Sequence, residues 1–149
     1  MERSLVLIKP DAVQRGLAGA IVSRWEQRGL KIVAMKMLRM DKALAERHYA
    51  IHKDKPFFKD LVAFITSSPV IAAVFEGERA VEIIRQTMGA TDPLKAAAGS
   101  IRGDLGLDLQ QNLVHGSDSV ENAAKEISIF FKPEEIMSYT KDVDKWTKS

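Results

Sequence analysis

The sequence predicts a single α/β domain, a sandwich in which helices cover a four-stranded sheet. Two observations predict it. Apolar runs typical of strands alternate with segments of helical periodicity, in the order β-α-β-α-β-α-β-α. The chain also has 149 residues, of which 46% are hydrophobic, enough to bury one core. Repeats, low-complexity segments and linkers are absent from the sequence, so we expect residues 1–149 to form one domain.

The first three elements follow from periodicity. Ser4–Lys9 is a continuous apolar run that Pro10 stops, which is typical of a strand buried on both faces. Four apolar residues at i, i+3, i+4 and i+7 then predict an amphipathic helix, and Gly29 stands where its C-terminal cap belongs. These four residues are Ala18, Ile21, Val22 and Trp25. A second strand is expected within Leu30–Met40.

Helical segments and a third strand occupy the middle of the chain. Residues 41–52 predict a helix with Asp41 as its N-cap, and residues 56–68 continue helically until Pro69. The third strand is expected at Pro69–Gly77. A helix from about residue 78 to residue 88 follows, and its apolar face comprises Ala80, Val81, Ile84 and Met88.

The last third of the chain begins with a loop. Periodicity is lost over Ala90–Gln111, and a loop of that length in a compact domain is usually functional. Asn112–His115 is the expected fourth strand, and Asp118 with Glu121 resembles a capping box that would start the final helix. The apolar face of that helix would consist of Val120, Ala123, Ala124 and Ile127.

Composition excludes several classes of function. Lys plus Arg total 22 against 20 Asp plus Glu, without a block of like charges, so a nucleic-acid partner is not indicated. With no cysteine, the sequence excludes disulfides, thiolate nucleophiles and cysteine metal sites. The apolar run Pro69–Phe75 is far below the ~18 residues of a membrane span, and the N-terminus lacks a signal-peptide core. We therefore expect a cytoplasmic protein with no membrane partner.

The segment Asn112–Glu126 is where chemistry is expected. His115 ends a predicted strand, and three residues later a helix begins whose free N–H groups would favour an anion. A phosphate bound there would meet an imidazole, and Glu126 is suitably placed to hold that ring in one tautomer. From the local pattern alone, His115 could equally be a packing residue at a strand end.

The other histidines and three basic residues leave alternatives open. His48 and His52 are four apart, so a helix would place both on one face, where they either bind a metal or simply pack. Lys9, Arg85 and Arg102 stand in unusual places for purely solvated charges. Neither a Walker loop nor a dinucleotide-binding glycine motif is present, so residues of another kind would have to bind a nucleotide.

The stretch "NLVHGSDS" at residues 112–119 resembles the active-site signature of the nucleoside diphosphate kinases. Further stretches resemble the same family in the same order: "ERSLVLIKPDAVQRGL", "HYAIHKDKPFF", "GATDPL", "GSIRGD" and "VENAAKEISIFF". The resemblance runs from Glu2 to about Tyr139. It implies a ferredoxin-like βαββαβ fold with a four-stranded antiparallel sheet covered by helices.

The resemblance also implies a reaction. Members of the family transfer the γ-phosphate of a nucleoside triphosphate, typically ATP, to nucleoside or deoxynucleoside diphosphates by a ping-pong route. His115 would become the phosphohistidine. Mg²⁺ would be the cofactor, held mainly by the nucleotide phosphates rather than by the protein. Two rivals are a noncatalytic ferredoxin-like nucleotide-binding or regulatory module and a histidine phosphotransfer carrier, whose histidine would instead lie on a helix of a bundle.

Position by position, the resemblance assigns further roles. Lys9 would contact the transferring phosphate and the sugar, and Asn112 the ribose 3′-hydroxyl. Glu126 would orient the ring of His115, and Ser117 would steady that pair. The outer phosphates would be held by Arg85, Thr91 and Arg102. Phe57 would stack on the base opposite Leu109, and Tyr49 would lie close to His115.

Assembly is the last implication. The family forms homo-oligomers, and the tail from Ser138 to Ser149 favours a hexamer over a tetramer. Lys55 and the sequence of the long loop depart from the common family pattern, in regions that support subunit contacts.

Overall fold

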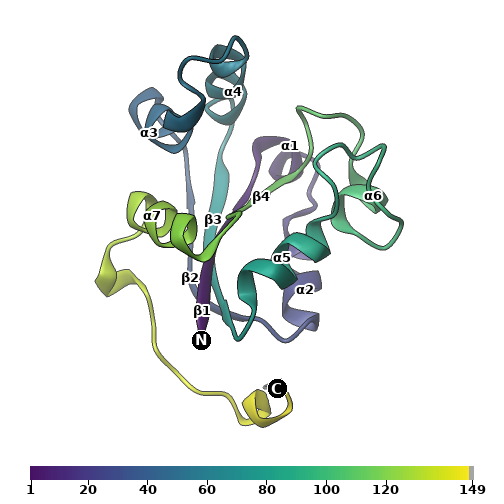
Figure 1. The fold of residues 1–149 in the computed structure, drawn as a ribbon, viewed down its shortest axis with the longest axis vertical. Helices are drawn as coiled ribbons and strands as arrows, with labels where there is room; N and C mark the ends of the chain where they lie inside the picture. Colours follow the sequence, from purple (N-terminus) through teal and green to yellow (C-terminus); the bar gives the residue numbers. More distant parts are fainter. Residues whose placement is uncertain (148–149) are drawn as a thin grey trace.

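The computed structural model describes residues 1–147 and contains a four-stranded antiparallel sheet, as the sequence and the resemblance predict (Figure 1). Its strand order is β2-β3-β1-β4. The strands are β1 (Glu2–Ile8), β2 (Lys31–Leu38), β3 (Val70–Gly77) and β4 (Val114–Gly116). β1 and β3 occupy the centre, so β2 and the short β4 form the two edges.

Helices cover both faces of the sheet, because β1 sends alternate side chains to opposite sides (Figure 1). Val6 and Ile8 enter a core with α2 (Ala18–Gln27) and α5 (Ala80–Met88), while Leu5 and Leu7 enter a second core. The helices of the second face are α3 (Lys42–His48), α4 (Phe58–Ile65) and α7 (Val120–Phe130). The apolar faces predicted for α2 and α5 are confirmed by these contacts.

Register places the histidine of interest on the second face. In the β1–β4 pairing, Leu7 lies opposite His115 and Ile8 lies opposite Val114. Directly paired residues of antiparallel strands project from the same face. The side chain of His115 therefore projects toward α3 and α7, the same side as Leu7.

Three local predictions were wrong at the first turn of a helix. Pro10 does not only stop a strand: it opens α1 (Pro10–Gln14), where the missing N–H of proline costs nothing. The long loop contains α6 (Ile101–Leu105), whose cap Ser100 accepts a hydrogen bond from the N–H of Gly103. The final helix is capped by Ser119 rather than by an Asp118–Glu121 box, because the Ser119 hydroxyl reaches the N–H of Asn122.

Two further helical predictions need correction. The helix over residues 41–52 has the predicted Asp41 cap, but α3 ends at His48 and the chain continues as the 3-10 turn η1 (Ala50–His52). On α7, Val120 is 54% exposed and Ala124 is also exposed. The other two predicted residues are confirmed, because Ala123 is buried and Ile127 packs against the second core, where Phe130 joins it. This places Glu126 on the inward side of the helix, in contact with His115.

The tail after α7 folds back along β2, with the short turns η2 (Pro133–Glu135) and η3 (Asp142–Trp146) (Figure 1). Lys31 anchors it by donating to the carbonyl of Tyr139, and it forms an ion pair with Asp144 at 3.1 Å. The hydroxyl of Tyr139 donates to the carbonyl of Ile32. Residues 148 and 149 of the tail lie outside the described part of the chain. Among residues 1–147, no helix has the length and apolar character needed to cross a membrane.

Candidate active site

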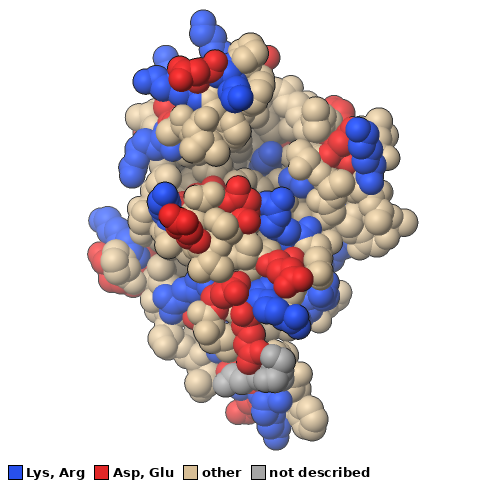
Figure 2. Space-filling model, viewed as in Figure 1, with Lys and Arg blue, Asp and Glu red and all other residues tan. Residues whose placement is uncertain are grey.

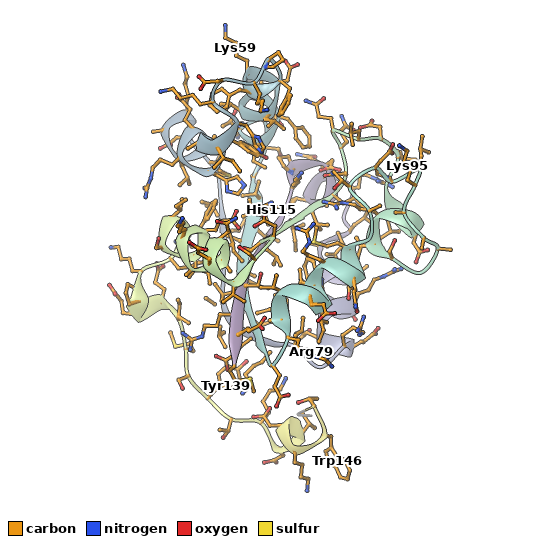
Figure 3. The ribbon with its side chains drawn as sticks, viewed as in Figure 1. Lys59, Arg79, Lys95, His115, Tyr139 and Trp146 are labelled. Atoms are coloured by element: carbon orange, nitrogen blue, oxygen red, sulfur yellow. The ribbon has the colours of Figure 1, made fainter. Side chains whose placement is uncertain are left out.

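A cavity of about 480 Å³ opens beside the C-terminal end of β1. Its walls come from the α3–η1 segment, α5, the loop before α6, β4 and α7. Lys9, Arg85 and Arg102 all line it, although they are far apart in the sequence. Figure 2 shows basic side chains gathered around this hollow in the middle of the molecule, and Figure 3 places His115 there. The cavity therefore combines the imidazole of His115 with a concentration of positive charge, as an anionic substrate requires.

The centre of the cavity is a hydrogen-bonded triad of side chains. Nε2 of His115 lies 3.0 Å and 3.1 Å from the two carboxylate oxygens of Glu126. The hydroxyl of the fully buried Ser117 donates to the same carboxylate at 2.5 Å. Burial alone would raise the pKa of Glu126, but the hydrogen bonds from His115 and Ser117 outweigh it and hold that pKa below its ordinary value. Glu126 is therefore ionised at neutral pH.

The ionised carboxylate fixes the tautomer of the ring. A carboxylate can only accept hydrogen bonds, so Nε2 of His115 must carry the proton that points at Glu126. In the neutral imidazole the lone pair then belongs to Nδ1. The arrangement thus presents one ring nitrogen as a nucleophile and uses the other to hold the ring in place.

Lys9 is held in the cavity by a chain of hydrogen bonds. Its Nζ donates to Oδ1 of Asn112 at 2.8 Å, and Nδ2 of Asn112 donates to the carbonyl of Thr91 at 3.1 Å. Burial, and then the charge of Arg102, lowers the pKa of Lys9 to about 8, although Asp11 opposes this shift. At pH 7 the ammonium is still mostly charged, but it lacks a full complement of water. An entering phosphate would supply the missing negative partner.

Arg102 contributes both to the structure and to the charge of the site. Only 5% exposed, it donates from Nε to the carbonyl of Asn112 and from its two terminal nitrogens to the carbonyls of Gly89 and Val114. Burial and the nearby charge of Arg85 lower its pKa to about 10, so it remains charged at neutral pH. A guanidinium has five N–H groups, so these three bonds leave donors for an anion.

A tight turn at Leu113 joins Asn112 to β4. Leu113 has a φ of 76°, and the N–H of Val114 donates to the carbonyl of Asn112 at 2.9 Å, which closes a γ-turn. The carboxylate of Asp11 accepts from the N–H of Leu113 at 3.1 Å, and the N–H of Lys9 donates to the carbonyl of Leu113 at 2.9 Å. A non-glycine residue at positive φ is strained, and here α1 and the end of β1 hold it in place.

His48 is a site residue that the sequence did not reveal. Its ring meets that of His115 edge-on, with centroids 4.7 Å apart and an interplanar angle of 87°. Burial, followed by the proximity of His115, lowers the pKa of His48 to about 3, so this ring is neutral at physiological pH. The spacing of His48 and His52 was a signal, but it did not indicate which of the two faces His115. That depends on the helix ending at His48.

The region next to His52 of the cavity wall is built differently. We call this region, formed by Phe57, Leu109 and their neighbours Asp60 and Gln110, the outer lip. Phe57 is 45% exposed and Leu109 is 61% exposed. The side chain of Gln110 donates to the carbonyl of Asp60 at 3.5 Å, which brings the loop of Leu109 beside α4. The ring of Phe57 lies 5.5 Å from that of His52, a residue of the cavity wall.

The structure gathers most of the predicted site residues in one place. Those that line the cavity are Lys9, Arg85, Thr91, Arg102, Asn112, His115 and Glu126. Ser117 supports Glu126 from behind, and Tyr49 packs in the second core with its ring 4.6 Å from that of His48. Phe57 and Leu109 lie at the outer lip. Further wall residues that the sequence did not indicate as site residues include Arg47, Ile51, Asp118, Asn122, Lys125 and Ile129.

Comparisons with known proteins identify the same family over nearly the whole chain. The family model described as nucleoside diphosphate kinase matches residues 2–136. A nucleoside diphosphate kinase of Thermomicrobium roseum is 56% identical over 146 residues, covering 98% of this chain and 98% of that protein. One from Dehalococcoides mccartyi strain BAV1 is 60% identical over 139 residues, covering 93% of this chain and 98% of that protein.

Solved structures show the same fold. A halophilic nucleoside diphosphate kinase from Halobacterium salinarum, determined in complex with CDP, superimposes with a TM-score of 0.96 at 51% identity. A nucleoside diphosphate kinase family protein from Babesia bovis superimposes with a TM-score of 0.95 at 45% identity. Each comparison covers 99% of both chains.

Proposed function

This chain belongs to the nucleoside diphosphate kinase family, and from that membership we propose that His115 carries the phosphoryl group between nucleotides. The enzyme transfers the γ-phosphate of a nucleoside triphosphate to a nucleoside diphosphate through a phosphohistidine. The observation that supports the assignment is the bond between Nε2 of His115 and Glu126, because it leaves a lone pair on Nδ1 inside a basic cavity.

In the first half-reaction, the lone pair of Nδ1 attacks the γ-phosphorus. A nitrogen–phosphorus bond forms while the bond from the γ-phosphorus to the β-bridging oxygen breaks, and the nucleoside diphosphate leaves with that electron pair. The ring gains positive charge as it reacts, and the Glu126 carboxylate at 3.0 Å stabilises that charge. The second half-reaction is the reverse, with another nucleoside diphosphate as the acceptor, so one cavity serves both substrates.

The basic residues of the cavity would neutralise the phosphates. Lys9 would contact both the transferring group and the sugar, and its hydrogen bond to Asn112, the residue assigned to the ribose 3′-hydroxyl, supports this role. Arg85, Thr91 and Arg102 would hold the outer phosphates. Their positions before substrate arrives are set by bonds such as those of Arg102 to three backbone carbonyls. Charge that is fixed in advance needs little reorganisation in the transition state.

Mg²⁺ fits this site as a partner of the substrate. The described cluster of possible metal ligands in the cavity, His48, His115 and Glu126, offers two imidazoles, whereas Mg²⁺ prefers oxygen. We therefore assign its coordination mainly to the phosphate oxygens, where it would neutralise charge on the transferring group. The cavity residues would position the phosphates to which the ion is bound.

The outer lip would receive the base. Phe57 presents an exposed ring, and stacking on a ring accepts every base because each has a π-face. Leu109 would cover the opposite face of the base. The Halobacterium salinarum protein was determined with CDP, which supports the acceptance of a pyrimidine base here.

A labelling experiment tests the assignment of His115. Mixing the protein with γ-labelled ATP should give an acid-labile, base-stable label on the chain, and GDP or a deoxynucleoside diphosphate should discharge it. His115→Ala should lose the label while still binding nucleotide, because the remaining cavity residues are unchanged. Label that persists in His115→Ala, or that nucleotides do not discharge, would contradict the assignment.

Assembly, domain extent and location complete the proposal. We propose that residues 1–149 act as one domain within a homo-oligomer, a hexamer rather than a tetramer. Edge strand β2 supports self-association, since its Met35 and Met37 are 44% and 61% exposed. Sedimentation equilibrium would test this, with six times the 16.6 kDa chain mass expected.

We place the enzyme in the cytoplasm because its substrates are nucleotides, and cell fractionation would check that placement.

A further inference from the structure

We propose that His48, His115 and Glu126 form a zinc site whose occupation switches the enzyme off. One ligand atom from each residue lies within 4.8 Å of the others. Two imidazole nitrogens and a carboxylate oxygen are a donor set typical of Zn²⁺ sites that keep a fourth position open. The cavity would leave room at that position for a water molecule.

An unpartnered buried nitrogen supports the site. Nδ1 of His48 is buried and has no hydrogen-bond partner among residues 1–147. Buried polar atoms are usually satisfied, so an exception in a functional cavity requires an explanation. The His48 side chain is buried, so little of its hydration remains to be lost when a metal binds.

The spacing of the three ligand atoms is close to the spacing of ligands around a tetrahedral zinc ion. Ligands about 2.1 Å from a tetrahedral ion lie about 3.4 Å from one another. Nε2 of His115 is 3.0 Å from Oε2 of Glu126, and the widest separation in the group is at most 4.8 Å. Closing the group therefore takes movements of up to about 1.5 Å, which are within the range of side-chain rotation. Mg²⁺ would compete poorly, because it prefers oxygen donors in octahedral geometry.

The switch follows from the tautomer of His115. In the metal-free enzyme the proton on Nε2 points at Glu126, and the lone pair belongs to Nδ1. Zn²⁺ bound at Nε2 takes the lone pair on that nitrogen, so the ring proton moves to Nδ1, which can no longer attack phosphorus. Conversely, a phosphoryl group on Nδ1 leaves the proton on Nε2 and excludes the metal. Zinc and the phosphoryl group should therefore be mutually exclusive.

Calorimetric titration of the nucleotide-free enzyme with Zn²⁺ alone tests the site. We expect one Zn²⁺ per chain, and we expect His48→Gln to weaken binding by roughly tenfold or more. His52→Gln is the matched control, since His52 also lines the cavity but lies outside the ligand group. It should retain wild-type affinity. Failure of the wild type to bind, equal binding by His48→Gln, or loss in His52→Gln would overturn the site.

A second measurement does not depend on the folding of a variant. Enzyme phosphorylated with ATP, then freed of Mg²⁺ and nucleotide, should bind Zn²⁺ at least about tenfold more weakly than the same preparation after discharge by GDP. Equal affinity of the two forms would overturn the mutual exclusion. Binding to the free enzyme tests the ligand group alone, whereas inhibition rests on the proposed role of His115. Zinc that binds without slowing phosphorylation would therefore contradict that role and leave the site standing.

Discussion

The inner end of the site, inside the cavity, and the outer lip beside it differ in how firmly their side chains are held. At the inner end, Nε2 of His115 contacts both oxygens of Glu126, Lys9 bonds to Asn112, and Arg102 bonds to three backbone carbonyls. At the outer lip the aromatic and aliphatic residues are largely exposed, and the two sides are joined by a 3.5 Å hydrogen bond from Gln110.

This difference separates two tasks within one site. Transfer of a phosphoryl group requires charges and a nucleophile fixed within a fraction of an ångström, so the inner end is built from interlocking hydrogen bonds. Accepting several bases requires a surface that does not discriminate, and the exposed apolar side chains of the outer lip would supply it. Substitutions at the inner end should therefore lower kcat, while those at the outer lip should raise KM.

Among substitutions that leave His115 in place, Glu126→Ala should have the largest effect. Without the carboxylate, neither the tautomer nor the orientation of His115 is fixed, and we expect kcat to fall by roughly 10²- to 10⁴-fold. Glu126→Gln should fall between this variant and the wild type, because its amide oxygen can still accept from Nε2 but carries no charge. Single-turnover phosphorylation by ATP gives the measurement. Unchanged rates in Glu126→Ala would show that catalysis does not depend on the fixed geometry of the inner end.

The next largest effect should be the pH dependence of kcat/KM that arises from Lys9. Its pKa is lowered to about 8, so Lys9 is charged below that pH and neutral above it. We expect kcat/KM, which reports the free enzyme, to decline by about tenfold per pH unit above pH 8. Lys9→Arg keeps its charge and should remove this decline, even if its rate is lower throughout. A decline that persists in Lys9→Arg would assign the titration to another group.

Ser117→Ala should have a smaller effect of the same kind. Ser117 supplies the 2.5 Å bond behind Glu126, so its loss should lower kcat by about tenfold while KM changes little. The pair of substitutions Ser117→Ala and Glu126→Ala tests the coupling. Their combined effect should be close to that of Glu126→Ala alone, since Ser117 acts through Glu126. Fully additive effects would show that the two residues act separately.

Phe57→Ala should have the smallest effect and should fall on KM. Loss of the ring at the outer lip should weaken the binding of every nucleotide by about five- to tenfold. This loss is near the lower end of the range for base stacking, because the ring is 45% exposed. Phe57→Tyr retains a flat ring and serves as the control. Comparing ADP, GDP and CDP as acceptors would show whether the loss is uniform. A large drop in kcat would contradict the separation of tasks between the inner end and the outer lip.

Much of the fold was predictable because it depends on periodicity. The continuous apolar run of β1 and the apolar stripe on α5 can be buried in few other ways. The errors arose where short local signals compete. Asp118 and Ser119 are both good caps, and which of them bonds to the helix depends on the path of β4. Pro10 can stop a strand or start a helix, and here it does both.

The site was predicted unevenly for a related reason. A local pattern could point to His115, because a strand end followed by a helix start is visible in the sequence. The gathering of Lys9, Arg85 and Arg102 is a property of the tertiary structure, and only the family resemblance indicated it. His48 was not assigned to the site, because its contact with His115 depends on where α3 ends and how it packs on α7.

The γ-turn at Leu113 determines which side chains of residues 112–115 project from the same side of the strand. Residues three apart on a regular strand project from opposite sides, so an unbroken strand would send Asn112 and His115 in different directions. The turn skips one step: both of these polar residues line the cavity, while Leu113 and Val114 both enter the core of α2 and α5. Straightening the backbone there would leave the sequence of the segment unchanged and still separate Asn112, the proposed sugar contact, from His115, the proposed nucleophile.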